Sequence, residues 1–332
     1  MPYSILNIII QLKVSLFLLL IVTILFSSVS CSKDTPLIEE KTPVLSIQDS
    51  LILVDMFHEM GGPGWRYYDK WDLKRPVSEW KGVTLKLVDN SIRVSELWFY
   101  GINEIIGTLT PKIGDLSELE SLSLAGKQLT GPIPETIGKL KKLKNFRLYY
   151  TGLSSIPQTI GDLQNLETLD FDENPNLEGG IPTEIVKLNK LKILYIRHSE
   201  NLGGIIPTEI GRLKNLNILY LFNLGLIGEL PQSLGQLENI HEMNFLNNSL
   251  SGSIPIELAN LRNSFVSLSY NKLSGEIPTE FGESSVILSA TNNNLIGEIP
   301  LGILNRYTEI DLKRKICPQN IGFGFINCTS SN

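Results

Sequence analysis

The chain has 332 residues, of which 42% are hydrophobic and 19% charged, and its formal net charge is −6. This much apolar material excludes an intrinsically disordered chain and is enough to bury a large core. The acidic balance argues against a general nucleic-acid-binding protein, which usually carries a basic stripe. With only three cysteines and three histidines, we expect no disulfide-dense scaffold, no metal site and no cofactor.

Residues 1–30 are predicted to be a signal peptide. Lys13 precedes a 13-residue apolar run at 14–26, and the small residues 27–30 follow. A basic start, an apolar stretch of this length and a small-residue end are typical of a secretory signal. The run is shorter than the ~20 apolar residues that a membrane-spanning helix needs.

Cys31 stands directly after those small residues, and this arrangement resembles the bacterial lipoprotein signal, in which the cysteine becomes the acylated first residue. Ser28 stands where that signal usually has leucine. The resemblance implies an exported protein, lipid-anchored at the cell envelope, either at the outer membrane or at the cell surface. The alternative is ordinary secretion with an incidental cysteine. Residues 31–46 are polar, contain two prolines and would form a tether.

Residues 49–60 have apolar side chains at helical spacing and end at Gly61-Gly62, which predicts a helix. Three tryptophans, Trp65, Trp71 and Trp80, follow this helix closely. We therefore expect residues 47–90 to form an N-terminal cap whose interior is built by aromatic side chains.

Nine prolines then recur at nearly constant spacing, with successive differences of 23, 23, 25, 25, 24, 24, 23 and 22 residues. A fixed period of this length indicates a stacked repeat architecture. Each period holds a Leu-x-x-Leu-x-Leu core, such as Leu119, Leu122 and Leu124, and closes with Leu-x-Gly-x-Ile-Pro. The prolines are Pro111, Pro134, Pro157, Pro182, Pro207, Pro231, Pro255, Pro278 and Pro300.

This pattern resembles the leucine-rich repeat of the plant-like subclass, over about ten strand units in residues 91–312. The resemblance implies an α/β solenoid, a right-handed superhelix with a concave parallel β-sheet, short 3₁₀ or irregular convex returns and a helical N-terminal cap. The alternating leucines also support short strands, because leucines then point inward and the residues between them outward. One unit cannot bury its apolar face alone, so units must stack around a shared core.

The chain departs from this family at several positions. The cap usually carries a cysteine pair, where Ser78 and Leu85 stand here, so aromatic packing must hold it. The asparagine that usually follows each strand is replaced in half of the units, most plainly by Leu224. Near the end, Asn263 and Ser285 take the place expected for the first strand leucine.

A last strand is expected near Tyr307, Ile310 and Leu312, followed by a C-terminal cap at 313–332. Cys317 and Cys328 lie in this cap. In an exported protein two such cysteines are expected to form a small disulfide loop.

Catalytic chemistry has little support in this sequence. It contains no nucleophile elbow, phosphate-binding loop, dinucleotide fingerprint, zinc-protease helix or paired Cys-x-x-Cys. The three histidines, His58, His198 and His241, fall in different units without ligand spacing. We therefore expect a protein that is not an enzyme.

The outward strand positions are the candidate binding surface. Parallel strands stack ~4.8 Å apart, so equivalent residues of successive units form columns across the sheet. Exposed aromatic side chains together with arginine are typical of interface hot spots, although cross-strand pairing among themselves is the alternative. The candidate ligand-binding residues are Trp98, Tyr100, Arg147, Tyr149, Asp170, Asp172, Tyr195, Arg197, Tyr220, Phe222 and Asn244.

The sequence therefore predicts a non-enzymatic, surface-anchored recognition protein whose concave sheet binds another macromolecule, with protein as the preferred ligand. Two alternatives remain open at this point. One is a glycan-binding or adhesion protein, since exposed tyrosine and tryptophan rings can stack on sugars. The other is a structural envelope protein without a dedicated ligand. No nucleic-acid partner is expected, and the only membrane contact expected is through the lipid anchor.

Overall fold

The computed structural model describes residues 43–65, 71–99, 105–317, 319–320 and 324–325. The chain divides into two compact units, Met1–Thr42 and Pro43–Asn332, and all described residues belong to the second. The predicted signal peptide, Cys31 and residues 31–42 of the tether therefore lie outside the described residues, as do Tyr100 and Cys328.

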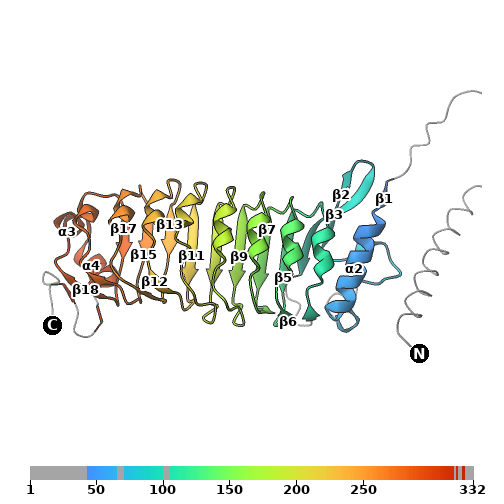
Figure 1. The fold of residues 1–332 in the computed structure, drawn as a ribbon, viewed down its shortest axis with the longest axis horizontal. Coiled ribbons are helices and arrows are strands. Elements are labelled where there is room, and N and C mark those ends of the chain that lie inside the picture. The colour runs from blue at the N-terminus through green and yellow to red at the C-terminus, as the bar shows by residue number, and fades with distance from the viewer. Residues whose placement is uncertain (1–42, 66–70, 100–104, 318, 321–323, 326–332) are drawn as a thin grey trace, which may run out of the picture. The chain divides into compact units, whose positions relative to one another are not determined.

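A single main sheet runs through the Pro43–Asn332 unit (Figure 1), and 11 of its strands lie in the described part. Except for β2, which is antiparallel to β3, neighbouring strands are parallel. This arrangement confirms the predicted α/β solenoid. In sheet order the strands are β1 (Val44–Leu45), β3 (Ser91–Phe99), β5 (Ser121–Ala125), β7 (Asn145–Tyr149), β9 (Thr168–Asp172), β10 (Ile193–Arg197), β11 (Ile218–Phe222), β13 (Glu242–Asn244), β15 (Phe265–Ser267) and β17 (Ile287–Ser289), with β2 (Val83–Val88) beside β3.

Short 3₁₀ helices form the return side of the coils. In the returns given below, except Ile210–Arg212, the recurring proline stands at the start, where its fixed φ and missing N–H suit the first turn. Successive returns pack closely: a Cβ on Gly114 would lie 2.1 Å from the carbonyl oxygen of Thr136 on the next return, so only glycine fits there. The returns are Pro111–Asp115, Glu135–Lys139, Gln158–Asp162, Thr183–Lys187, Ile210–Arg212, Gln232–Gln236, Ile256–Asn260 and Thr279–Gly282.

Shorter strands pair along a second side of the coils and form three small sheets in the part of the chain that the structure describes. The pairing is interrupted after β9 and β10, where Gly179-Gly180 and Gly203-Gly204 replace the strand residues. In these two coils successive recurring prolines are 25 residues apart, which is more than in the other coils. The longer coils are therefore the ones that lack the short strand. The strands are β4 (Ile106–Thr108), β6 (Gln128–Gly131), β8 (Gly152–Leu153), β12 (Ile227–Glu229), β14 (Ser249–Ser251), β16 (Ser274–Gly275), β18 (Asn294–Gly297) and β19 (Gly324–Phe325).

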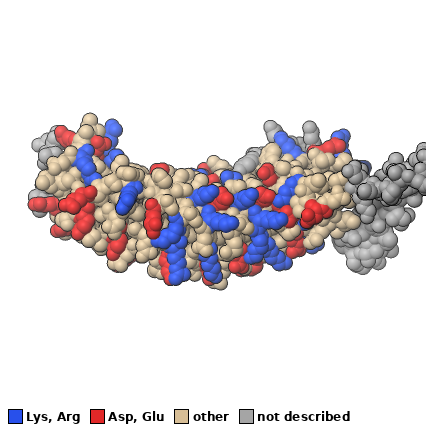
Figure 2. Space-filling model, turned by 90° about the horizontal axis from the view of Figure 1, so that it is seen from above, with Lys and Arg blue, Asp and Glu red and all other residues tan. Residues whose placement is uncertain are grey.

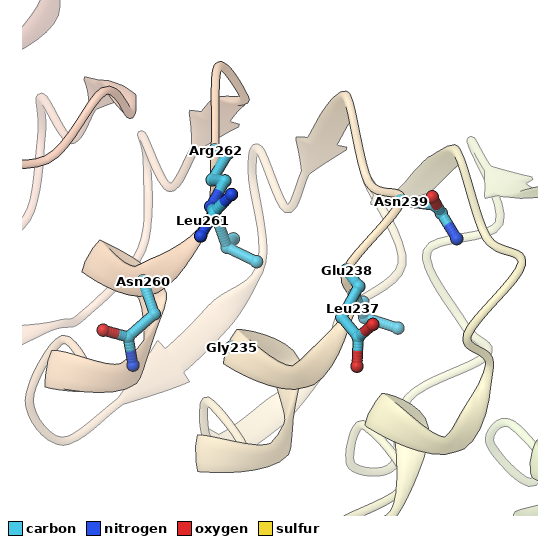
Figure 3. Close-up of a pocket in the computed structure, with 7 residues that line it drawn as sticks. All are labelled: Gly235, Leu237, Glu238, Asn239, Asn260, Leu261 and Arg262. Atoms are coloured by element: carbon cyan, nitrogen blue, oxygen red, sulfur yellow. The ribbon is translucent and has the colours of Figure 1, made fainter.

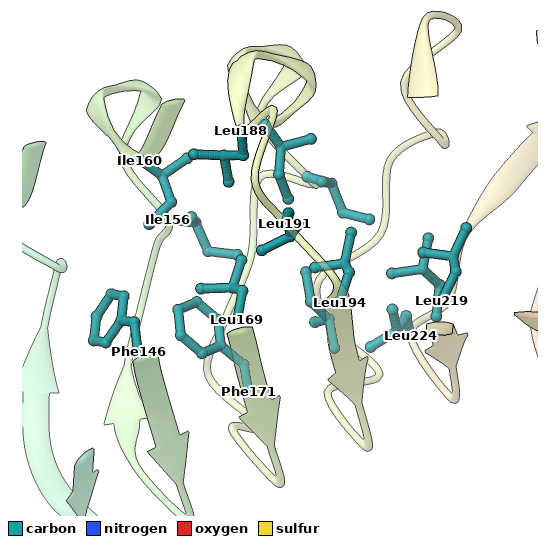
Figure 4. Close-up of a cluster of buried hydrophobic side chains, with 14 of the residues drawn as sticks. Phe146, Ile156, Ile160, Leu169, Phe171, Leu188, Leu191, Leu194, Leu219 and Leu224 are labelled. Atoms are coloured by element: carbon teal, nitrogen blue, oxygen red, sulfur yellow. The ribbon is translucent and has the colours of Figure 1, made fainter. Parts of the chain in front are cut away.

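One continuous apolar core fills the coils (Figure 4). Leu169 and Leu194 occupy equivalent positions on β9 and β10 and are both fully buried. Phe146 and Phe171 pack edge to face, with ring centroids 5.1 Å apart and planes at 87°. Because burying each such side chain contributes roughly 1.5–3 kcal/mol, the stack of leucines is the main source of stability.

Buried asparagines link successive coils through their backbones. The Asn271 side chain accepts the N–H of Leu250 at 3.0 Å and donates to the carbonyl of Phe245 at 2.9 Å. The interruption predicted at Leu224 is present: each asparagine accepts an N–H of the coil before it, and in place of such a bond the Ser199 N–H donates to the backbone carbonyl of Asn223 at 3.0 Å. The Leu224 side chain joins the core instead.

The N-terminal cap contains helix α2 (Ile47–Glu59), which begins at Ser46, whose hydroxyl accepts the N–H of Asp49. Short 3₁₀ turns at Gly62–Gly64 and Val77–Glu79 accompany it. Trp65, Trp71 and Trp80 are all buried, and the Trp71 and Trp80 rings stack with centroids 4.6 Å apart. The aromatic packing expected for residues 47–90 is therefore present among the described residues, while their role as a cap stays a prediction.

The C-terminal end corrects two expectations. The strand predicted near Tyr307, Ile310 and Leu312 is wrong: helices α3 (Leu301–Arg306) and α4 (Glu309–Lys315) occupy this region. Thr308 explains the difference, because its hydroxyl accepts the N–H of Asp311 while the Asp311 carboxylate accepts the N–H of Thr308, a capping box that starts a helix.

The position predicted for the first strand leucine in the last coils is also wrong by one residue. Asn263 and Ser285, which were predicted to take this buried position, are exposed, and the residues that follow them, Ser264 and Val286, are buried instead. The buried Ser264 hydroxyl donates to the carbonyl of Ile240 at 2.8 Å, which satisfies it inside the core.

Candidate functional site

The open sheet face consists of the side chains that the main sheet turns away from the leucine core. Along β10 and β11, half-buried and fully buried residues alternate. Five uncharged side chains of these two strands form what we call the aromatic patch. The patch consists of Ile193, Tyr195, Ile218, Tyr220 and Phe222.

Tyr195 and Tyr220 form a stacked pair at the centre of this patch. They are direct partners in the parallel register of β10 and β11, and their ring centroids lie 4.8 Å apart with planes at 27°. The Phe222 ring is tilted against Tyr220 at 5.9 Å. The Arg197 guanidinium carbon lies 4.7 Å from the Tyr195 centroid, within cation–π range.

Two aspartates of β9 hold that arginine in place. Arg197 Nη2 donates to Asp170 Oδ1 at 3.3 Å, and Arg197 Nε lies 3.1 Å from Asp172 Oδ2. Tyr149 donates its hydroxyl to Asp170 at 2.5 Å, and His198 Nδ1 lies 2.8 Å from Asp172 Oδ1. Burial raises the pKa of Asp170 above its ordinary value, although the Tyr149 hydrogen bond and the arginine oppose this.

The structure thus gathers seven of the predicted residues on β7, β9, β10 and β11: Tyr149, Asp170, Asp172, Tyr195, Arg197, Tyr220 and Phe222. Arg147 lies on the same face of β7, where it donates to Asn145 at 3.3 Å. Asn244 accepts the N–H of Leu246 at 2.9 Å. Trp98 is half-buried on β3 and stands apart, with β5, β7 and β9 between it and Tyr195.

Four residues of this surface were not among the candidate ligand-binding residues. Ile193 and Ile218 extend the aromatic patch, and the alternation with core leucines predicts them on the same outward face. Glu242 on β13 is the register partner of Ile218, and burial together with this carboxylate raises the pKa of Tyr220 above its ordinary value. His198 could not have been found from spacing, because it lies beyond β10 at a left-handed backbone position with φ of 50°.

A second feature is a ladder of charged side chains along the turns that lead into the strands. The Lys86 ammonium group lies 2.6 Å from Glu120 and 3.2 Å from Glu118, while Lys144 and Lys142 pair with the same two carboxylates at 2.7 Å. Hydrogen bonds from Lys144 and Lys86 lower the pKa of Glu120 from 4.5 to about 2. In the space-filling view, basic and acidic side chains lie interspersed along the visible face (Figure 2).

A shallow pocket of about 500 Å³ lies at the turns before β13 and β15 (Figure 3). It is lined by Gly235, Leu237, Glu238, Asn239, Asn260, Leu261 and Arg262. Leu261 has ψ of 148°, whereas the equivalent Leu237 has ψ of 81°, so the chain leaves this return in a different direction. The pocket brings together no pair of groups suited to catalysis.

The described residues contain no cluster of three or more histidine, cysteine, aspartate or glutamate side chains that could hold a metal ion. Within the same part of the chain, no helix is both long and apolar enough to cross a bilayer. Cys317 is half-buried against the C-terminal core, and because Cys328 lies outside the described residues, their disulfide stays a prediction.

Comparison with known proteins supports a leucine-rich repeat protein of the plant-like type. Residues 135–268 match the leucine-rich repeat region family, and residues 264–284 match the leucine rich repeat family. Among curated proteins, the polygalacturonase inhibitor of Pyrus communis is 32% identical over 142 residues, which are 42% of this chain and 39% of the inhibitor. The chain spans less than half the length of the curated relatives it matches.

Solved structures give the same picture. A plant ice-binding protein matches with a TM-score of 0.62 and 26% identity, covering 80% of this chain and 93% of that protein. The plant peptide hormone receptor RGFR1, in complex with RGF2, matches with a TM-score of 0.54 and 29% identity over 68% of this chain and 42% of the receptor. The Arabidopsis receptor kinase HAESA, in complex with the peptide hormone IDA and the co-receptor SERK1, matches with a TM-score of 0.57 and 25% identity. The match covers 77% of this chain and 47% of the HAESA chain.

Proposed function

We propose that this chain is a non-enzymatic recognition protein that binds a peptide or protein through the open sheet face. The observation that carries the proposal is the stacked pair of Tyr195 and Tyr220 with Arg197 beside it, on a half-exposed surface. Tyrosine and arginine supply large contact area with little loss of conformational freedom, and they dominate interface hot spots. Similar folds are seen in the receptors RGFR1 and HAESA, both solved with peptide hormones.

The patch is larger than cross-strand pairing requires. Arg197 is one-fifth exposed and already has two carboxylate partners, so the ion pairs account for its orientation. They do not account for five adjacent apolar side chains that remain partly open to solvent. Apolar groups gathered on an accessible sheet favour a binding surface.

The test of this proposal is partner capture by proximity labelling with the full chain, using a variant that carries Tyr195→Ala, Tyr220→Ala and Phe222→Ala together. Because these side chains lie outside the leucine core, we expect the variant to fold and to lose its partner. The matched control carries Tyr150→Ala and Tyr270→Ala, which remove exposed rings outside the patch. Partner capture that survives the triple substitution would falsify the proposal. A glycan array positive for the full chain, with no protein captured, would favour the glycan-binding alternative.

We further propose that the protein is exported and anchored at the outer membrane or cell surface through acylated Cys31. The apolar run at 14–26 and the small residues before Cys31 support this. Substitution Cys31→Ser should move the protein from the membrane fraction to the soluble fraction of the host. Unchanged fractionation would remove the anchor from the proposal.

The proposed disulfide between Cys317 and Cys328 has its own measurement. Mass spectrometry after alkylation of the unreduced native protein should find neither of these two thiols modified. Alkylation of both would show that the pair is reduced and that the C-terminal cap folds without the bond.

A further inference from the structure

Arg197 sits in a binding site that the chain builds for its own guanidinium group. The guanidinium carbon lies 4.7 Å from the centroid of the Tyr195 ring, Nη2 donates to Asp170 and Nε lies 3.1 Å from Asp172. A guanidinium has a flat face that suits an aromatic ring and edge N–H donors that suit carboxylates. One ring with adjoining carboxylates therefore holds this arginine, although its buried Nε makes no hydrogen bond.

The opposite end of the same stack repeats these parts. Tyr195 covers one side of Tyr220, and β13 follows on the other side, with Asn244 as the register partner of Tyr220. Glu242 precedes Asn244 on the open face by two residues, and together with burial its carboxylate raises the pKa of Tyr220 above the ordinary value. This end therefore also has a tyrosine ring beside a strand that carries a carboxylate, but with one carboxylate, Glu242, in register with Ile218, instead of the two aspartates in register with Tyr195 and Arg197.

At this end of the stack, the described residues supply no arginine to pair with the carboxylate. Among the described residues, no lysine, arginine or histidine forms an ion pair with Glu242, which is half-buried. A carboxylate can accept about four hydrogen bonds. The side-chain oxygen of Asn244 accepts the N–H of Leu246 at 2.9 Å.

We propose that the partner presents an arginine side chain that lies on Tyr220 and pairs with Glu242. This inference rests on the proposed function and names the chemistry of its ligand. The bound stack would run from Arg197 through Tyr195 and Tyr220 to the partner's arginine, with a carboxylate group at each end. The aliphatic stem of that arginine would cover Ile218, the neighbour of Glu242 in the register.

The ligand should be arginine rather than any cation. Lysine carries the same charge but lacks the flat guanidinium face and its paired donors. Citrulline keeps the shape and loses the charge. The expected order of binding is therefore arginine, then lysine, then citrulline.

The experiment is ¹⁹F NMR on the full chain labelled with fluorotyrosine at position 220, titrated with three blocked tripeptides: Gly-Arg-Gly, Gly-Lys-Gly and Gly-citrulline-Gly. The arginine tripeptide should shift the signal saturably, and the citrulline tripeptide should leave it in place. Substitution Glu242→Gln should weaken arginine binding by about tenfold, since it removes the charge and keeps the shape. The control Glu229→Gln, on β12 and outside the open face, should bind as the parent does.

Equal binding of the arginine and citrulline tripeptides, or parent-like binding by Glu242→Gln, overturns the inference. The partner itself separates this failure from failure of the proposed function. Capture that depends on the aromatic patch but is unchanged by Glu242→Gln would leave the proposed function standing and remove the arginine. Partner capture that is unchanged by the triple substitution in the aromatic patch would contradict the proposed function, regardless of the tripeptide results.

Discussion

Asp49 is fully buried in the N-terminal cap, and both of its oxygens accept hydrogen bonds. Arg93 donates to Oδ1 and Oδ2 at 2.9 and 3.0 Å, and the backbone N–H of Val94 donates to Oδ2 at 2.9 Å. This carboxylate therefore fastens helix α2 to strand β3. Removing one partner of such a buried pair leaves the other charge without compensation, which is far more costly than losing a surface pair.

We predict that Asp49→Ala lowers the free energy of unfolding by about 3–5 kcal/mol. The matched control on the same helix is Asp55→Ala, which breaks the exposed pair with Lys112 and should cost less than about 1 kcal/mol. Urea denaturation followed by tryptophan fluorescence measures both. Equal effects of the two substitutions would show that the buried pair does not anchor the cap.

This contact also shows what could not be predicted from the sequence. Asp49 and Arg93 are 44 residues apart, and nothing in their spacing indicates that they meet. The Tyr195 and Tyr220 pair was predictable in position, because both occupy the same place in consecutive repeats. Arg197 was predicted on the same surface, but its stacking on Tyr195 depends on side-chain orientation, which periodicity does not specify.

At the scale of elements, the ladder between Lys86, Glu120 and Lys144 connects the cap hairpin of β2 and β3 to the turns before β5 and β7. Because the pKa of Glu120 is lowered in the folded protein, the free energy of unfolding depends on pH. In the folded protein the pKa of Glu120 falls from 4.5 to about 2, so its contribution is fully present above pH 4.5 and is lost as the pH falls toward 2.

We predict that Glu120→Gln lowers the thermal midpoint at pH 6, and that the difference from the parent disappears as the pH falls from about 4.5 to 2. Thermal melts across this pH range measure it. The control is Glu178→Gln, at an exposed residue outside the ladder. Its thermal midpoint should change with pH in the same way as that of the parent. A difference that stays constant down to pH 2 would mean that the effect of Glu120 is not ionic.

Helices and strands were predictable where the repeat is regular, and their prediction failed where the repeat pattern changes. The coils from β5 to β13 follow the leucine spacing, because each inward position has room for one large apolar side chain. The same spacing wrongly extended a strand to Tyr307, since the Thr308–Asp311 capping box starts α4 locally. Ser264 was missed because its buried hydroxyl bonds the backbone, a partner that sequence spacing cannot show.

At the scale of the whole repeat array, each coil contacts mainly its neighbours, so the effect of a core substitution should stay local. We predict that Trp71→Ala, which empties the cap's aromatic interior, lowers stability by about 3–5 kcal/mol. Hydrogen exchange should accelerate in β3 and β5 and change little in β15 and β17.

The mirror-image control is Phe281→Ala, which truncates a fully buried ring in the last coils. It should accelerate exchange in β15 and β17 and leave β3 as it was. Uniform acceleration along all strands by either substitution would instead indicate that the array opens as a single cooperative unit.

The recurring proline corner has a consequence for how such a chain can change its length. Pro255 and Pro278 begin successive returns with nearly the same backbone angles, with φ of −63° and −53° and ψ of 132° and 137°. Excising the 23 residues from one corner to the next would join two like ends and leave every remaining strand in register. A gene encoding this fold can therefore grow or shrink by whole coils, whereas a one-residue slip inside a strand would exchange its buried and exposed sides.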